Sequence, residues 1–388
     1  MRGDWNYPTR VRFGAGRLEE IGSVLAEAGI ERPLIVTDPG LADLPMLTEL
    51  SDRCAHAGRS ATCFADSSPN PVGADVDAGA ALFRDTDRDG VIAIGGGSAL
   101  DVGKAIALVA RQDHDLWQFE DVGDNWTRAD SARIAPTIAI PTTAGTGSEV
   151  GRSSVIIDET AARKVIVFHP AMLPVQVICD PALTRSLPPH LTAATGMDAL
   201  SHSLEAFCAS GFHPMADGIA VEGMRLVATH LETATADGEN LEARSGMLAS
   251  SLMGATAFQK GLGAMHAMAH PIGAVLGAHH GLINAVVMPY VVVRNRAAVE
   301  DRLDRLATAL ELPGNDFEAV LAWILELRSR LSIPHTIDAL GVTEAHLDTL
   351  AAAAAIDPAG FGNPIPLTEA DYRLLLEDAL VGRLDAHA

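Results

Sequence analysis

The chain has few cysteines, a shortage of basic residues and no long uncharged run. Its four cysteines, in 388 residues, show neither the CxxC spacing of redox and metal motifs nor the density of a disulfide scaffold, so we expect buried or reduced thiols. Its 28 basic residues against 50 acidic ones give a net charge of -22. Because nucleic acids and anionic membranes bind clustered cations, and no run of Lys or Arg occurs, we expect neither as a partner.

No uncharged stretch reaches the length of a membrane span, and residues 1–16 lack the apolar core of a signal peptide. We therefore expect a cytoplasmic protein. A chain of 388 residues is long enough for two domains with buried cores.

The first half alternates short β-branched runs with helical patterns. Strands are predicted within residues 33–40, 60–71, 89–98 and 132–149. Helices are predicted over residues 17–29 and 76–86. Because continuous apolar strands separated by helices form parallel sheets covered on both faces, the pattern predicts an α/β domain with a parallel sheet.

The second half is rich in Ala, Leu and Met and has almost no strand signals. Helix-length periodic segments follow one another, and the alanine run near residues 350–357 also reads as a helix. Proline-containing breakers mark the change near residue 185. We therefore expect an α/β domain at 1–185 and an all-helical domain at 186–388.

A glycine-rich turn follows the predicted strand at Val91–Ile94 and leads into a helix. Its residues are Gly95, Gly96, Gly97 and Ser98. Glycines allow a ligand to approach the backbone, and the free N–H groups of a helix start bind anions, so this turn is a candidate phosphate site. The alternative is a plain strand-to-helix turn. Ser98 and Asp101 also have the spacing of a capping box that would fix the helix start.

The segment FGAG, with Gly14 and Gly16, is a weaker match to a phosphate-binding loop. No strong strand precedes it and the third glycine of the dinucleotide motif is missing. We interpret it as a turn.

Two further segments carry polar groups of the kind that contact a nucleotide. In residues 138–150, Pro141 ends a strand and a loop with two glycines follows. Its hydroxyl side chains belong to Thr142, Thr143, Thr146 and Ser148. This loop could bind phosphate or ribose, or it could be an ordinary polar loop. Asp38 ends the strand PLIVTD, where an acidic residue commonly binds the adenosine ribose. It could equally be a turn-forming Asp before Pro39 and Gly40.

A carboxylate and several imidazoles suggest a divalent metal site in the second half. Asp198 and His202 are four residues apart, so on a helix they face the same direction. Four histidines follow within one short segment, at His266, His270, His279 and His280. Mixed nitrogen and oxygen ligation suits Fe(II) and Zn(II), but the spacing does not choose which of these four histidines bind.

Four motifs together resemble the signatures of the iron-containing (group III) alcohol dehydrogenase family. They are GGGSALDVGKAIA, PTTAGTGSE, GMDALSHSLEAF and MHAMAHPIGA with HHGLINAVVMPYV, in the family's order and over nearly the whole chain. The resemblance implies the dehydroquinate synthase-like architecture, in which an α/β dinucleotide-binding domain precedes an all-α metal-binding domain.

The resemblance also implies roles for individual residues. It makes Asp198, His202, His266 and His280 the metal ligands, places His270 near the nicotinamide and substrate, and gives His279 no role. It assigns the pyrophosphate to Gly97 and Ser98 of the Gly96–Ser98 turn, with Asp101 close by. The other cofactor-lining residues would be Asn70, Thr142, Thr143, Lys164 and Leu183. Asp38 becomes the ribose ligand, which favours NAD over NADP.

Two positions depart from the family pattern. Residues 257–260 read Ala-Phe-Gln-Lys, and Gly151 is followed by Arg152. Lys260 and Arg152 could favour an anionic substrate, or be exposed charges with a structural role.

We therefore expect a metal-dependent, NAD-linked alcohol dehydrogenase. It would catalyse reversible hydride transfer between a primary or small secondary alcohol and NAD+, with Fe(II), or Zn(II), as Lewis acid. A homodimer or higher homo-oligomer is expected. The alternatives are a related reductase of maleylacetate reductase or glycerol dehydrogenase type, and a non-catalytic NAD- or metal-binding regulator. Retention of all four ligand positions favours the alcohol dehydrogenase.

Overall fold

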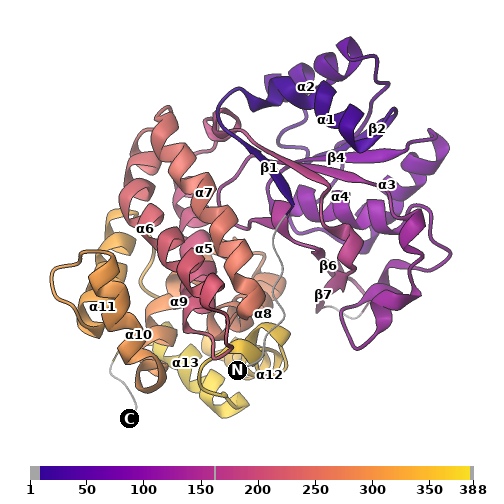
Figure 1. Ribbon diagram of the computed structural model, residues 1–388. Coiled ribbons are helices and arrows are strands. Elements are labelled where there is room, and N and C mark those ends of the chain that lie inside the picture. The colour runs from indigo at the N-terminus through magenta and orange to yellow at the C-terminus, as the bar shows by residue number, and fades with distance from the viewer. Residues whose placement is uncertain (1–8, 161–162, 385–388) are drawn as a thin grey trace. The chain divides into compact units, whose positions relative to one another are not determined.

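The computed structural model describes residues 9–160 and 163–384, which form two compact units divided between Ser186 and Leu187. The sequence places this boundary between residues 185 and 186. Among the described residues, every strand belongs to the first unit, and the second is helical (Figure 1).

A parallel sheet forms the centre of the first unit. Within the described residues it has six strands, in the order β1-β8-β5-β4-β2-β3. All of its neighbouring strands run parallel. The strands are β1 (Arg10–Phe13), β2 (Pro33–Val36), β3 (Thr62–Phe64), β4 (Gly90–Gly95), β5 (Thr137–Pro141) and β8 (Gln176–Cys179).

The register of the sheet aligns its isoleucines on one face. Ile35 pairs with Ile92, and Ile92 with Ile138, so the side chains of these neighbours lie in a row. They share one buried cluster with apolar residues of α1 (Ile21–Ala28) and α2 (Pro45–His56). Every residue of β2, β4 and β5 is buried, so both faces of these strands are covered, which accounts for their continuous apolar sequences.

Helices α3 (Gly73–Asp85) and α4 (Gly97–Val109) complete the α/β pattern. On α4, a Cβ built at Gly103 would lie 2.6 Å from Ala93 of β4, so this helix packs directly on the sheet. Figure 1 shows α1 and α2 on one side of the strands and α4 on the other. The 3-10 helices of this unit span Arg17–Glu20, Leu116–Phe119, Asn125–Arg128, Ser131–Arg133, Ser148–Val150, Pro170–Met172 and Pro181–Thr184.

The four strands that the sequence predicts are β2 to β5, and other strands were missed. The edge strand β1 carries two arginines, and Arg12 pairs with Glu20 and Glu27, so the strand lacks an apolar pattern. Because β1 ends at Phe13, a short strand does precede Gly14, although its sequence carries no strong strand signal. The short β8 and an antiparallel hairpin were also missed; the hairpin consists of β6 (Ser153–Asp158) and β7 (Arg163–Phe168).

The sheet contains a topological switch point between the adjacent strands β2 and β4. The chain leaves β2 toward β3 on one side, and leaves β4 toward β5 on the other. Ligands of open α/β sheets bind beyond the carboxyl ends of the strands at such a point. Asp38 lies two residues after β2, and the glycine-rich turn begins at Gly95, the last residue of β4.

The second unit is built around α5 (Pro189–Cys208), which is buried on all sides from Thr192 to Phe207. Its other helices are α6 (Pro214–Ala236), α7 (Leu241–Ala257), α8 (Ala264–Leu276), α9 (His280–Arg294), α10 (Arg296–Ala309), α11 (Phe317–Arg330), α12 (Leu347–Ala355) and α13 (Glu369–Val381). Short 3-10 helices span Phe258–Lys260, Ile337–Leu340, Glu344–His346 and Pro358–Gly362. A buried central helix has no solvated face, so polar residues on it need partners inside the protein.

No single helix in the described parts of the chain is long and apolar enough to cross a membrane. One pair, α9 with α10, meets the length and composition requirement jointly but is bent by 109°.

Candidate metal centre and cofactor-binding residues

Three polar residues of α5 share one face of this buried helix. Asp198, His202 and Glu205 follow one another at intervals of four and three residues. They are 2%, 5% and 5% exposed. Such burial is unfavourable for charged and polar groups unless they are bonded or hold a metal ion.

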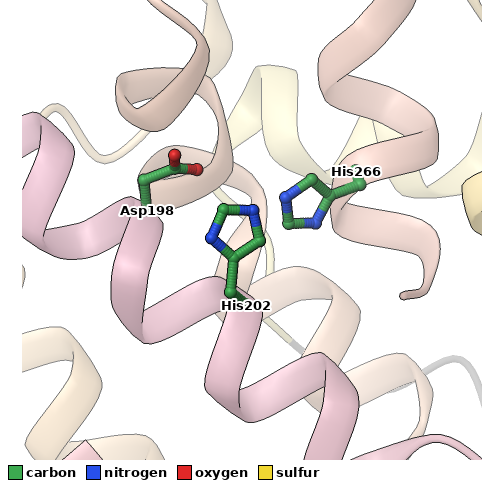
Figure 2. Close-up of side chains that lie close together, drawn as sticks. All are labelled: Asp198, His202 and His266. Carbon is green, nitrogen blue, oxygen red and sulfur yellow. The ribbon is translucent and has the colours of Figure 1, made fainter. Parts of the chain in front are cut away.

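His266 of α8 brings a further ligand atom to this face. One ligand atom each from Asp198, His202 and His266 lie within 4.8 Å of one another. The rings of His202 and His266 are stacked with centroids 4.7 Å apart. Figure 2 shows Asp198 and His202 one turn apart on the same helix, with His266 pointing toward them from another. A carboxylate and two imidazoles at these distances are suitable ligands for a divalent ion.

His280, the first residue of α9, lies beside this group. Its Nε2 is 3.8 Å from Oδ1 of Asp198, and its ring centroid is 5.3 Å from that of His266. Its side chain is 27% exposed, so it is the most accessible of the four predicted ligands. The structure therefore brings all four together, with three in a tighter group.

Asn284, one turn further along α9, supports a cation at this place. Its Nδ2 lies 2.9 Å from Asp198 Oδ1 and 3.2 Å from Nε2 of both His266 and His280. An amide NH2 has two hydrogens and cannot satisfy three acceptors fully. Its own Oδ1 is buried without a partner among the described residues. The three acceptor atoms, one from Asp198 and one each from His266 and His280, converge on one point. A metal ion there would bind all three, whereas the amide group cannot donate to all of them.

His270 lies one turn after His266 on α8, and its ring is held by a carboxylate. Its Nδ1 is 2.9 Å from Oδ2 of Asp357, and both side chains are 14% exposed. Its ring stacks on His280 with centroids 5.4 Å apart. His279 is exposed at the start of α9, outside the group of three.

The charges around His266 act on its protonation. Burial by itself lowers the pKa of His266, but the contact with Glu205 and the charges of Asp198 and Asp357 outweigh it, so the pKa is raised. The site is therefore electronegative, which favours a bound cation.

In the first unit, the glycine-rich turn packs against the hydroxyl-rich loop. A Cβ built at Gly97 would lie 2.6 Å from Cγ2 and 2.8 Å from Oγ1 of Thr146, and one at Gly96 would lie 3.4 Å from Thr143. The N–H of Thr142 donates to Gly95 O at 2.9 Å. Two segments that are distant in sequence thus form one surface at the carboxyl ends of β4 and β5.

The predicted capping box of α4 was wrong. The helix begins at Gly97 without a side-chain cap, and Ser98 Oγ donates to Pro69 O at 2.6 Å. Asp101 instead accepts from Ser148 Oγ at 2.5 Å and from Val155 N at 2.9 Å. Tertiary partners outcompete the local cap, so these residues tie the turn to neighbouring segments.

Asp38 follows β2 and lies next to the glycine-rich turn. A Cβ built at Gly95 would lie 3.2 Å from its Oδ2. Burial raises the pKa of Asp38, and the backbone N–H groups of Gly40 and Leu41 partly oppose this. The carboxylate therefore takes part in the local turn and also lies at the switch point.

The remaining predicted cofactor residues occupy different surroundings. Asn70 is half-buried and follows Pro69, the partner of Ser98. Lys164 is the ladder partner of Ile157, whose N–H donates to Pro71 O at 2.8 Å, so the hairpin lies beside the Asn70 segment. Leu183 belongs to the buried isoleucine cluster.

Lys260 and Arg152 both have partners within their own units. The Lys260 ammonium donates to Asp217 Oδ1 at 2.5 Å and Phe207 O at 3.1 Å, and its side chain is 0% exposed. The guanidinium of Arg152 lies 5.5 Å from the centroid of Phe168. Lys260 therefore has a structural role, and the expectation that it is an exposed charge was wrong.

Sequence reasoning missed three polar residues near the predicted metal ligands. Glu205 and Asn284 were detectable, because they continue the helical spacing from His202 and His280. Asp357 gave no local signal, because it is 87 residues from His270 in the chain.

Comparison with known proteins identifies the family. Residues 8–181 match the family described as iron-containing alcohol dehydrogenase, and residues 192–380 match the C-terminal domain of the Fe-containing alcohol dehydrogenase family. The 4-hydroxybutyrate dehydrogenase of Cupriavidus necator is 39% identical over 384 residues, which cover 96% of this chain and 99% of that protein.

Solved structures agree over the full length. A crystal structure of 1,3-propanediol oxidoreductase has a TM-score of 0.94 at 32% identity, covering 98% of this chain and 100% of that one. Sulfoacetaldehyde reductase from Bifidobacterium kashiwanohense, in complex with NAD+, has a TM-score of 0.90 at 31% identity, covering 99% and 100%. The expected fold class is confirmed. The chain belongs to the iron-containing alcohol dehydrogenase family.

Proposed function

We propose that this oxidoreductase transfers a hydride reversibly between a primary or small secondary alcohol and NAD+, with a divalent metal ion, Fe(II) or alternatively Zn(II), bound in the helical unit. The observation that carries the proposal is the buried convergence of Asp198, His202 and His266 within 4.8 Å. The NAD+ complex of the related sulfoacetaldehyde reductase supports the choice of cofactor.

Asp198, His202, His266 and His280 are the proposed metal ligands. One carboxylate with three neutral imidazoles leaves an ion with net positive charge. When bound, such an ion supplies a Lewis acid that makes an alcohol O–H more acidic. The buried helices hold these side chains in place, so little reorganisation is needed when the ion binds.

His270 is the proposed proton-handling residue. With Nδ1–H donated to Asp357, its Nε2 is the atom that holds or releases a proton. Its ring stacks on that of His280, which places it next to the metal ligands. Asp357 fixes the orientation of the ring.

The cofactor is proposed to bind at the carboxyl ends of β2, β4 and β5. The N–H groups at the start of α4 would hold the pyrophosphate at Gly96, Gly97 and Ser98. Asp38 would accept hydrogen bonds from the adenosine ribose, and its charge disfavours the 2′-phosphate of NADP. The other proposed contacts are Asn70, Asp101, Thr142, Thr143, Thr146, Ser148, Lys164 and Leu183.

The 39% identity with 4-hydroxybutyrate dehydrogenase supports including ω-hydroxy acids among the candidate substrates. We also propose a cytoplasmic homodimer or higher homo-oligomer, because closed symmetric assemblies predominate among soluble oligomeric enzymes.

The test is turnover by protein reconstituted with metal. The purified protein is stripped with a chelator and reloaded anaerobically with Fe(II) or Zn(II), and NADH formation is followed with butan-1-ol, 1,3-propanediol and 4-hydroxybutyrate. We expect turnover that depends on metal. A metal-independent reductase of the same fold would reduce its substrate after stripping, and a regulator would bind NAD+ without turnover of any alcohol or aldehyde.

His280→Ala and His279→Ala form a matched pair of adjacent substitutions. We expect His280→Ala to weaken metal binding by at least about a hundredfold and to abolish turnover. His279→Ala should retain both, because His279 is exposed outside the group. Full metal content and activity in His280→Ala would contradict the ligand assignment.

A further inference from the structure

Glu205 lies one turn after His202 on α5 and makes three close contacts with the start of α8. Its Oε2 accepts from Gly263 N at 2.9 Å and lies 2.6 Å from His266 Nδ1. Its Oε1 accepts from Met265 N at 2.6 Å. The side chain is 4% exposed, so water does not compete for these bonds.

This carboxylate replaces the missing N-cap of α8. Gly263, the residue before the helix, has no side chain that could cap it. It also cannot acquire one, because a Cβ there would lie 2.9 Å from both Glu205 Oε1 and Asn363 Oδ1. A buried carboxylate that meets three N–H groups therefore anchors the segment that begins α8.

The same contact fixes the tautomer of His266. An ionised carboxylate only accepts hydrogen bonds, so the neutral imidazole must carry its proton on Nδ1. The lone pair then lies on Nε2, which is the ring nitrogen next to Asn284 Nδ2, 3.2 Å away, in the group of metal ligands. Ligation of the ion through Nε2 requires this tautomer.

We propose that Glu205 is a positioning residue of the metal site, which fixes the Nδ1–H tautomer and ring orientation of His266 so that Nε2 is free to bind the ion. The role in metal binding rests on the proposed function. The tautomer itself does not, because it is a property of the metal-free protein.

Glu205→Gln is the informative substitution because it preserves shape and removes one acceptor. If the amide oxygen accepts from Met265, the NH2 group faces His266 Nδ1 and stabilises the Nε2–H tautomer, which cannot bind the ion through Nε2. If the oxygen faces His266, the NH2 group opposes the N–H of Met265. Gln therefore cannot satisfy all three donors.

Asn363→Ala is the structural control. Asn363 Oδ1 accepts from Ala264 N at 3.2 Å at the same helix start, and its side-chain hydrogen bonds within the described residues go to Ala264, Asn295 and Ile365 rather than to a proposed metal ligand. It also bonds Asn295, so its loss lowers stability in its own right. A purely structural role for Glu205 predicts that both variants behave alike.

Three measurements distinguish the two roles. Long-range 1H–15N spectra of metal-free protein, at a pH where His266 is neutral, report its tautomer, with the signal assigned by its loss in His266→Gln. Competition with a chromogenic chelator gives the dissociation constant for Zn(II). Thermal unfolding gives the stability of each variant.

We expect the Nδ1–H tautomer in the wild type, a shift toward Nε2–H in Glu205→Gln, and metal binding weakened about 10–100-fold. Asn363→Ala should lower the melting temperature and change the metal affinity less than about threefold. An Nε2–H tautomer in the wild type overturns the proposal without any variant, as does wild-type metal affinity in Glu205→Gln. If the wild type shows Nδ1–H but binds no metal, the positioning by Glu205 stands and the proposed function fails.

Discussion

The substitution Gly281→Ala tests whether the close approach of α9 to α5 is needed to assemble the metal site. Gly281 is the second residue of α9, directly after His280. A Cβ at this position would lie 2.4 Å from Ala194 O and 2.9 Å from Asp198 Cβ. The carbonyl belongs to the backbone of a buried helix and cannot rotate away, so α9 must move.

The size of the effect follows from these distances. A carbon and a carbonyl oxygen need more than about 3 Å, so the start of α9 must shift by a large fraction of an ångström, and overpacking of this kind costs about 1–3 kcal/mol. The shift also stretches the 2.9 Å hydrogen bond from Asn284 to Asp198, which contributes about 1 kcal/mol. Ala has a higher helix propensity than Gly, but the gain is small at position 281 because it lies in the first turn of α9. We therefore expect a net destabilisation of about 2 kcal/mol.

The same displacement moves His280 away from Asp198, so metal binding should weaken about tenfold or more. The assay is unfolding of the stripped and the Zn(II)-loaded protein, because a ligand stabilises the native state according to its affinity. A tenfold weaker affinity lowers the metal-induced stabilisation by about 1.4 kcal/mol at fixed free metal.

Gly218→Ala is the control for this experiment. Gly218 is exposed on α6, and apart from its chain neighbours and the adjacent backbone of α6, no atom of the described residues lies within 4 Å of a Cβ built there. This substitution should stabilise the protein by up to about 1 kcal/mol and leave metal affinity unchanged. Wild-type stability and metal affinity in Gly281→Ala would refute the reasoning, because they would show that α9 does not need to pack this closely.

Lys260→Met should lower the free energy of unfolding by about 2 kcal/mol, since it removes the buried partner of Asp217. The ratio of the turnover rates with 4-hydroxybutyrate and butan-1-ol should stay unchanged. A selective loss of turnover with the anionic substrate would show that Lys260 contacts the substrate. Glu149 is buried and its pKa is raised from 4.5 to about 7 by burial. Between these two values the folded state holds a proton that the unfolded state has lost. This carboxyl should therefore contribute about 3 kcal/mol to the free energy of unfolding below pH 4.5, and the contribution should disappear as the pH rises through about 7. Denaturant unfolding measured between pH 4.5 and 7 should show that the free energy of unfolding falls less with rising pH in Glu149→Gln than in the wild type. An equal fall in both proteins would contradict the raised pKa of Glu149. Gly97→Ala should weaken NADH binding at least about tenfold in calorimetry, because the added Cβ would lie 2.6 Å from Thr146; unchanged affinity would place the cofactor elsewhere.

Much of the fold was predictable because it depends on local pattern. The apolar runs of β2, β4 and β5 are buried on both faces, and they were identified in the sequence together with the edge strand β3. The edge strand β1 was not, because it carries charged side chains, and the four-residue strand β8 was also missed. The capping box at Ser98 and Asp101 failed for a related reason: its side chains have stronger partners far away in sequence.

The candidate site divides in the same way. The four-residue step from Asp198 to His202 guarantees a shared helix face, so the sequence by itself determined that these two residues could hold one ion. It could not choose among His266, His270, His279 and His280, because helix spacing says nothing about which helices pack together.

Tertiary packing places these four histidines in different surroundings. It places His266 opposite His202, turns His270 to Asp357, and leaves His279 exposed. It also brings Glu205 to the Nδ1 of His266, a contact across 61 residues of chain. The sequence determines which side chains are available and how they repeat along each helix. Only the folded chain decides which nitrogen of which imidazole faces the ion, because that depends on contacts between segments distant in sequence.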